Sequence, residues 1–218
     1  MKKLIQGIVD FRKSLTEESR ALFAKLAIEQ KPDTLFIGCS DSRVVPNLFA
    51  STNPGDLFVL RNIGNLIPPA HSILQDNSAS AAIEFAIFSL NVSDIIICGH
   101  SECGAMQALG AGVDTLNCPH LESWLQFGKE SVEKVRKGFT TDPTLSEHNQ
   151  ISQINVLQQM EHMKSYPFVR DRLEKKEIRV HGWWFDIAEA DVYCYEQDLN
   201  QFILIDEKEA NLILGRAN

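Results

Sequence analysis

The sequence predicts an α/β fold with a mostly parallel central β-sheet flanked by helices, and three observations support this class. Apolar runs rich in β-branched residues alternate with segments of helical periodicity, an order typical of parallel sheets. The run Ile95–Ile97 is continuously apolar, as expected of a strand covered on both faces. Two such runs end in polar residues that can bind metal, at the place where open α/β sheets bind ligands.

The first elements in chain order are a helix and two strands. Apolar residues at helical spacing predict a helix over Ile5–Ala27, and residues 1–30 are therefore expected to form an N-terminal helical arm. Short apolar runs predict strands at Leu35–Ile37 and Asp56–Leu60. Good helix formers follow from Ser78, the expected N-cap, to Leu90.

The later elements continue the alternation. The run Ile95–Cys98 predicts a strand that ends at Gly99 and His100. Two helices are expected at His120–Lys137 and Leu145–Lys164, separated by a loop that contains Asp142 and Pro143. Ile178–Trp183 reads as another strand, and Phe202–Ile205 as a C-terminal strand on the sheet edge.

Bulk properties limit the classes of function. The 218 residues fit a single domain over 1–218, with an ordinary globular share of 44% hydrophobic residues. The formal net charge of -8 is opposite to the basic surface that nucleic-acid binding requires. No apolar run is long enough to span a bilayer, and Gln6, Asp10 and Arg12 interrupt the start too early for an export signal. We therefore expect a cytoplasmic protein with no nucleic-acid or membrane partner.

Three residues with metal-binding side chains follow two of the predicted strands. Cys39 ends the first strand segment, and His100 and Cys103 follow the third. If these strands are neighbours, the three side chains converge on one crevice. Two thiolates and one imidazole suit Zn²⁺, and three protein ligands leave the fourth position open, as in catalytic zinc sites. Taken singly, such a cysteine is most often a core residue, and such a histidine a structural one.

Asp41 and Arg43 come just after the first of these cysteines. A guanidinium beside a carboxyl group keeps the carboxylate ionised, so Asp41 can accept a hydrogen bond from zinc-bound hydroxide. The alternative is a surface ion pair of little energetic value. The five cysteines are odd in number and sparse, which is not typical of a disulfide framework.

These residues resemble the signature of the β-class carbonic anhydrases. The resemblance rests first on Cys39-Ser40-Asp41-Ser42-Arg43 and on His100-Ser101-Glu102-Cys103-Gly104. Further matching segments are Arg61–Asn65, Ala82–Phe85 and His181–Trp183, so the match runs from about Gln30 to Asp186.

The resemblance implies a zinc enzyme that interconverts carbon dioxide and bicarbonate. Cys39, His100 and Cys103 would hold Zn²⁺, and hydroxide on the metal, oriented by Asp41 and Arg43, would attack carbon dioxide and yield bicarbonate and a proton. In a closed state Asp41 would become the fourth ligand. The family also implies a homodimer or a dimer of dimers, a homotetramer.

The resemblance further implies a substrate pocket at a subunit interface. By similarity to plant-type members, Gln30 would donate to the substrate, and Phe58 and Phe85 of the neighbouring subunit would form apolar walls. Ile63 and Gly104 would line the rest, although core packing explains the apolar positions equally well. Plant-type members have Tyr in place of Phe85, so any hydroxyl contact there is lost.

A non-catalytic bicarbonate site occurs in some bacterial members of this family. It uses a Trp, an Arg and a Tyr, and the matching residues here are Phe36, Arg61 and Phe185. Because both polar aromatic groups are missing, we expect no bicarbonate inhibition through this site and a structural or interface role for Arg61.

Three other functions remain open from the sequence. A related zinc hydrolase could act on carbon disulfide or carbonyl sulfide with the same ligands. A non-catalytic zinc-binding regulatory protein would not need the Asp41–Arg43 pair. A cysteine-based redox enzyme would need an exposed, activated thiol, and the chain has no Cys-x-x-Cys motif.

Overall fold

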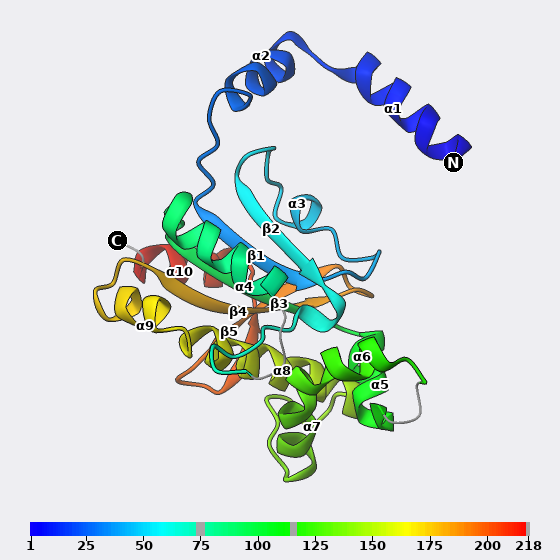
Figure 1. Ribbon diagram of the computed structural model, residues 1–218, viewed down its shortest axis with the longest axis vertical. Coiled ribbons are helices and arrows are strands. Elements are labelled where there is room, and N and C mark those ends of the chain that lie inside the picture. Colours follow the sequence, from blue (N-terminus) through cyan, green and yellow to red (C-terminus); the bar gives the residue numbers. More distant parts are fainter. Residues whose placement is uncertain (73–76, 114–116, 217–218) are drawn as a thin grey trace.

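The computed structural model describes residues 1–72, 77–113 and 117–216 of the chain, and its centre is a six-stranded sheet (Figure 1). The strand order is β2-β1-β3-β4-β5-β6, in which the first four strands run parallel and the last two antiparallel. The predicted fold class is confirmed, including the strand at the C-terminal edge. The strands are β1 Thr34–Cys39, β2 Leu57–Asn62, β3 Asp94–His100, β4 Arg179–Asp186, β5 Asp191–Glu196 and β6 Gln201–Leu204.

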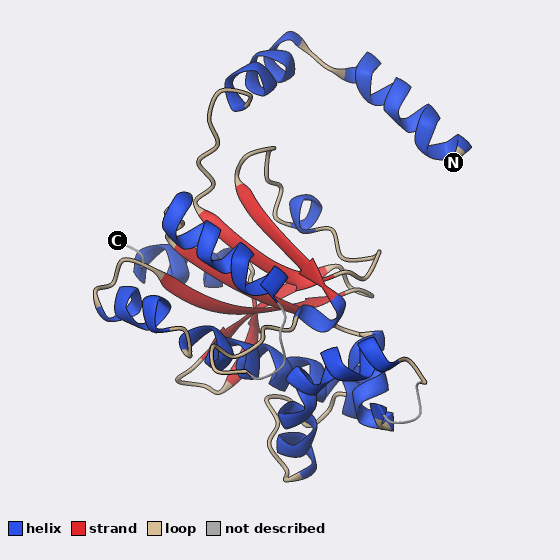
Figure 2. Cartoon of the chain, in the orientation of Figure 1, coloured by secondary structure: helices blue, strands red, loops and turns tan. Residues whose placement is uncertain are grey.

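Helices flank this sheet, apart from the N-terminal pair, which projects away from it (Figure 2). They are α1 Lys2–Ser14, α2 Glu17–Leu26, α3 Pro46–Phe49, α4 Asn77–Glu84, α5 Gly104–Ala111, α6 Pro119–Leu125, α7 Lys129–Arg136, α8 Glu147–Lys164, α9 Pro167–Glu174 and α10 Glu207–Arg216. Along the described residues, no helix combines the length and the apolar character that crossing a bilayer requires.

The two faces of the sheet are covered by different parts of the chain. Because side chains alternate along a strand, Leu35 and Ile37 of β1 face one side, where they form a core with α4, α8 and α9. Phe36 faces the other side, in a smaller cluster with Ile96 and Phe185.

A third apolar cluster lies beyond the carboxyl ends of the parallel strands. It joins α5, α6, α7 and α8, with Met106, Leu125 and Ile151 fully buried. Cys39 and Cys103 belong to this cluster. The candidate ligands therefore lie where the sheet meets a separate layer of helices.

The N-terminal arm is helical, as expected, but the single helix predicted over Ile5–Ala27 is wrong. Leu15 is extended, and the chain re-enters a helix at Thr16, whose side chain caps α2 by accepting a hydrogen bond from the Ser19 N–H at 3.1 Å. Neither α1 nor α2 buries a residue, and Figure 1 shows both projecting away from the sheet.

Two other predicted helices are interrupted, and several elements were missed. The helix expected over His120–Lys137 is divided by a 3₁₀ turn at Gln126–Gly128, and the helix expected over Ser78–Leu90 ends in a π-helical turn at Phe85–Ser89. At Gly128 the backbone approaches α5 so closely that a Cβ atom would lie 2.7 Å from Leu109. The sequence patterns predicted no element at the positions of α3, α5, α9, α10 and β5.

Candidate metal centre

Cys39, His100 and Cys103 converge because their strands are direct neighbours. Gly38 of β1 pairs with Cys98 of β3, so both strands end at the same edge of the sheet. Cys103 follows a short turn and forms the N-cap of α5. The three side chains are buried, their ligand atoms all lie within 4.8 Å of one another, and the two Sγ atoms are 4.0 Å apart.

The hydrogen bonding of His100 fits a metal ion. Nδ1 of His100 bonds to the Ser101 carbonyl at 2.8 Å, which leaves Nε2 for another partner. Within the described residues, Nε2 is buried and has no hydrogen-bond partner. Two sulfur ligands of a tetrahedral zinc ion lie about 3.8 Å apart, close to the separation of the sulfurs here. The donor atoms and their spacing therefore suit Zn²⁺.

The two thiols differ in acidity because they form a hydrogen bond with each other, in which one sulfur keeps the proton and the other is more easily ionised. The hydrogen bond from Cys103 lowers the pKa of Cys39 to about 4, against the opposing effect of burial. Contacts with His100 and with the Gly64 N–H lower this pKa further. The same hydrogen bond with Cys39, together with burial, raises the pKa of Cys103. A metal cation that binds both sulfurs would displace the proton of the hydrogen bond between them.

Asp41 is held by Arg43 in a two-pronged pair. Nε and Nη2 of Arg43 donate to the two carboxylate oxygens at 2.9 and 2.8 Å, and the Arg43 N–H also donates to Oδ1. These bonds hold the pKa of Asp41 well below its usual range, so the carboxylate is ionised. Nη2 of Arg43 also donates to the Glu102 carbonyl at 3.0 Å. This bond joins the loops that follow β1 and β3, which are called the ligand loops here because they begin at the candidate ligands Cys39 and His100. Among the described residues, the metal-capable group comprises the three ligands without Asp41.

Arg61 supports the same loop through the backbone. Its guanidinium donates to the carbonyls of Cys39 and Asp41 at distances from 2.6 to 3.0 Å. Phe36 and Phe185, its expected partners in the bicarbonate site, are both buried against the sheet. These contacts agree with a structural role for Arg61, and the absence of bicarbonate inhibition stays a prediction.

The proposed pocket residues fall into two groups. Ile63 follows β2 and is 44% exposed, and Gly104 follows the candidate ligand Cys103, so both lie in segments beside the cluster. Phe58 and Phe85 contact each other, with ring centroids 5.7 Å apart. Phe58 pairs with Leu35, at the end of β1 opposite to Cys39. Gln30 is exposed between α2 and β1. Within one chain, Gln30, Phe58 and Phe85 are not brought to the ligands.

A polar stripe on α8 was not recognised from the sequence. The name polar stripe is used here for Asn149, Ser152, Asn155 and Gln159, which are buried and spaced three or four residues apart, so that they share one side of the helix. The signal lay in this spacing, since amide and hydroxyl side chains recur among Ile151, Ile154 and Val156 without a charged residue.

Two residues of the polar stripe hold the His100–Cys103 turn. Oδ1 of Asn149 accepts a hydrogen bond from the Glu102 N–H at 2.8 Å, and its amide donates to the Glu102 carboxylate at 3.0 Å. These bonds fix Glu102 in a left-handed conformation, with φ of 54°. The Ser152 hydroxyl donates to the His100 carbonyl at 2.8 Å and itself accepts from Trp184.

The other two residues of the stripe hold the segment after β2. The Asn155 amide donates to the Gly64 carbonyl at 3.1 Å. Oε1 of Gln159 accepts from the Ile67 N–H at 2.8 Å. α8 therefore fixes the backbone on two sides of the candidate centre, namely the His100–Cys103 turn and the segment after β2.

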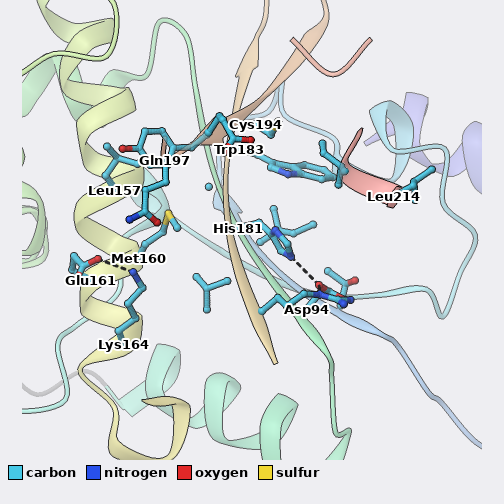
Figure 3. Close-up of a pocket in the computed structure, with 18 of the residues that line it drawn as sticks. Asp94, Leu157, Met160, Glu161, Lys164, His181, Trp183, Cys194, Gln197 and Leu214 are labelled. Atoms are coloured by element: carbon cyan, nitrogen blue, oxygen red, sulfur yellow. Dashed lines mark hydrogen bonds and ion pairs between the residues drawn. The ribbon is translucent and has the colours of Figure 1, made fainter. Parts of the chain in front are cut away.

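A separate cavity of about 670 Å³ lies near the amino ends of β3 and β4 (Figure 3). Asp94, Arg179 and His181 line it, together with Trp183 and Met160. The Asp94 carboxylate already has partners, because it accepts from Arg179 at 2.7 Å and from His181 at 2.8 Å. Cys39, His100 and Cys103 are not part of its lining.

Comparisons with known proteins give a consistent result. The carbonic anhydrase family matches residues 34–192. A carbonic anhydrase of Helicobacter pylori is 35% identical over 92% of this chain and 93% of its own, and one of Synechococcus elongatus is 37% identical over 99% and 82%. Among solved structures, the β-carbonic anhydrase CcaA is 35% identical with a TM-score of 0.85, covering 94% of this chain and 98% of its own. A tetrameric β-carbonic anhydrase of Sordaria macrospora is 29% identical with a TM-score of 0.77, covering 88% and 95%.

Proposed function

The chain belongs to the β class of carbonic anhydrases, and we propose that it hydrates carbon dioxide reversibly at a zinc ion held by Cys39, His100 and Cys103. The observation that carries the assignment of the metal is the buried Nε2 atom of His100, which has no partner among the described residues and faces two sulfurs. Two sulfurs and one nitrogen are a zinc ligand set with one position left for water or substrate.

Zinc at such a site would act as a Lewis acid and lower the pKa of bound water to ~7. Carbonic anhydrases are the established example of this effect. The chain's own residues supply orientation. Arg43 keeps Asp41 ionised, and an ionised carboxylate can only accept hydrogen bonds. Asp41 can therefore accept a hydrogen bond from a water or hydroxide molecule beside the three proposed ligands. This hydrogen bond would fix the orientation of that molecule. Arg61 and Arg43 fix the loop carbonyls around Cys39, Asp41 and Glu102.

A closed state is part of the proposal. In this state Asp41 would leave Arg43 and would hold the zinc ion together with Cys39, His100 and Cys103, which would exclude water and substrate. The change would break the two hydrogen bonds that the Arg43 guanidinium donates to Asp41.

We also propose that the working enzyme is a cytoplasmic homodimer or a dimer of dimers. The related structures from Sordaria macrospora are described as tetrameric. Gln30, Phe58 and Phe85 lie apart from the ligands of their own chain, so any contact with substrate must occur at the site of a neighbouring copy. Ile63 and Gly104 would line the pocket of their own chain.

Stopped-flow hydration of carbon dioxide by zinc-loaded protein, from neutral to alkaline pH, tests the proposal. We expect activity that rises with pH, disappears on chelation and returns with added zinc. Cys103→Ala should lose both zinc and activity, whereas Cys118→Ala, at an exposed cysteine outside the cluster, should keep both.

Absence of activity at every pH, with zinc fully bound, would overturn the assignment. Turnover of carbon disulfide or carbonyl sulfide by the same sample would then identify a related hydrolase. Inactivity towards all three substrates would favour a regulatory zinc protein.

A further inference from the structure

Trp124 of α6 reaches the candidate centre through a single peptide unit. Its indole Nε1–H donates to the Ile63 carbonyl at 2.7 Å. The N–H of the same peptide unit belongs to Gly64, and it donates to the Cys39 sulfur at 3.4 Å. A trans peptide is planar, so its C=O and N–H point in opposite directions. Holding the carbonyl therefore also aims the N–H at the sulfur.

Gly64 is confined in a conformation that suits this role. Its φ of 78° lies in the left-handed region, which glycine adopts without a steric penalty. A Cβ atom at this position would lie 3.0 Å from Ala105 and 3.1 Å from Met106, at the start of α5. Asn155 of the polar stripe fixes the following peptide through the Gly64 carbonyl.

A hydrogen bond to a metal-bound thiolate changes the ligand itself. The N–H group draws charge from the sulfur, which then donates less charge to the metal. The indole bond to the Ile63 carbonyl polarises the peptide and makes its N–H a stronger donor. The three groups thus form a chain of hydrogen bonds that links Trp124 to Cys39 through the Ile63–Gly64 peptide.

We propose that Trp124 is a positioning residue of the metal centre: it holds the Ile63–Gly64 peptide so that the Gly64 N–H donates to the Cys39 thiolate and limits the charge this ligand gives to the metal. The inference rests on the proposed function in taking Cys39 as a metal ligand. It does not depend on the identity of the substrate.

Protein loaded with ¹¹³Cd²⁺ in place of zinc tests the hydrogen bond directly by NMR. Scalar coupling between ¹¹³Cd and the Gly64 amide proton passes only through the N–H···S bond and the sulfur. We expect this coupling in the wild-type chain and its weakening or loss in Trp124→Phe. Wild-type protein with bound ¹¹³Cd and no coupling to Gly64 would overturn the inference, and this measurement needs no variant.

Trp124→Phe removes the indole N–H and keeps an aromatic ring near Phe127, whose ring centroid lies 5.4 Å away. In Co²⁺-loaded protein, the sulfur-to-cobalt charge-transfer band should move to longer wavelength, because the thiolate becomes richer in electrons. In zinc-loaded protein, kcat/KM at neutral pH should fall by roughly 10-fold, with a smaller loss at alkaline pH.

Trp183→Phe is the matched control, since this tryptophan lies on β4 beside the separate cavity. It should leave the cobalt band and the cadmium coupling unchanged. A Trp124→Phe protein that binds cobalt with an unshifted band, even if it is less stable, would show that Trp124 only supports the fold. Wild-type protein without carbon dioxide hydration but with the cadmium coupling would sink the proposed function and leave this inference standing.

Discussion

Several charged side chains of this molecule bind specific partners in short loops and at strand ends. Arg43 and Arg61 bond to main-chain carbonyls on both ligand loops, and Asp94 joins the start of β3 to β4. Burial raises the pKa of Asp94, but hydrogen bonds from His181, Arg179 and Ser93 outweigh this effect and hold its pKa well below the usual range. Asp94 therefore couples the stability of the fold to pH.

Asp94→Asn should lower the free energy of unfolding at pH 7 by about 1–2 kcal/mol, because the partners are partly exposed to solvent. A carboxyl group whose pKa is lowered by folding stabilises the protein above its unfolded pKa of about 3.9, and this contribution is lost as pH falls through the folded value. The difference between the two proteins should therefore shrink below about pH 4. Urea unfolding at several pH values measures it.

Asp171→Asn provides the control, because this carboxyl is exposed on α9. It should change stability little at any pH. A loss in Asp94→Asn that stays constant from pH 7 down to acid conditions would contradict the assigned role of the carboxylate.

At the scale of helices and strands, α8 connects the sheet to the ligand loops. Gly99 of β3 lies so close to this helix that a Cβ atom would be 2.8 Å from the Val156 side chain and 3.2 Å from the Ser152 carbonyl. Ser152 also holds the His100 carbonyl. The absence of a side chain at Gly99 therefore allows the polar stripe to reach the centre.

Gly99→Ala should destabilise the fold by about 1–3 kcal/mol, since the added methyl group forces α8 away from β3. It should also weaken zinc binding, because Ser152 moves away from the carbonyl of a ligand. Chemical unfolding and competition with a chelator measure the two effects. Gly104→Ala is the control for stability, as a Cβ atom there would meet nothing within 4 Å among the described residues. Equal stability of both variants would contradict this account.

Periodicity predicted most of the parallel strands and the length of α8, because continuous apolar runs and long helices carry strong local patterns. It missed the interruption at Thr16, where a capping side chain competes with an otherwise helical pattern. It also missed β5, whose pairing with β4 and β6 is set by neighbours in space. The clustering of Cys39, His100 and Cys103 was predictable, because these residues lie at the ends of two apolar strand patterns or just after them. The polar stripe was not, because its role depends on which backbone atoms α8 meets.

At the scale of the whole molecule, the N-terminal arm leaves a large apolar surface uncovered. Leu4 and Ile8 of α1 are each 67% exposed, and no residue of α1 or α2 is buried. The pocket residues Phe58 and Phe85 also lie apart from the ligands of their own chain. No local pattern in the sequence places these surfaces, because in the proposed assembly their contacts would be made with another copy. The single-domain expectation for residues 1–218 stays a prediction.

The double substitution Leu4→Asp and Ile8→Asp should weaken self-association. If the assembly buries these two side chains, their loss costs about 3 kcal/mol of association free energy, roughly 100-fold in the dissociation constant. Sedimentation equilibrium should show an assembly for the wild-type chain and a shift towards the 24.5 kDa monomer for the variant. Gln6→Asp with Ser14→Asp adds the same charge to α1 at polar positions and should keep the assembly. A wild-type monomer would contradict the role given to the arm.

For the proposed zinc ion, the positions of Cys39 and Cys103 at the ends of different segments would also determine when the metal is captured during folding. Cys39 and Cys103 are 64 residues apart in sequence, and they meet only after β1 pairs with β3. In the unfolded chain the entropy of closing so long a loop opposes their joint binding of one ion. Metal in the refolding mixture will thus hardly accelerate folding. Once bound, it must be released before the two strands separate, so it lengthens the lifetime of the native state.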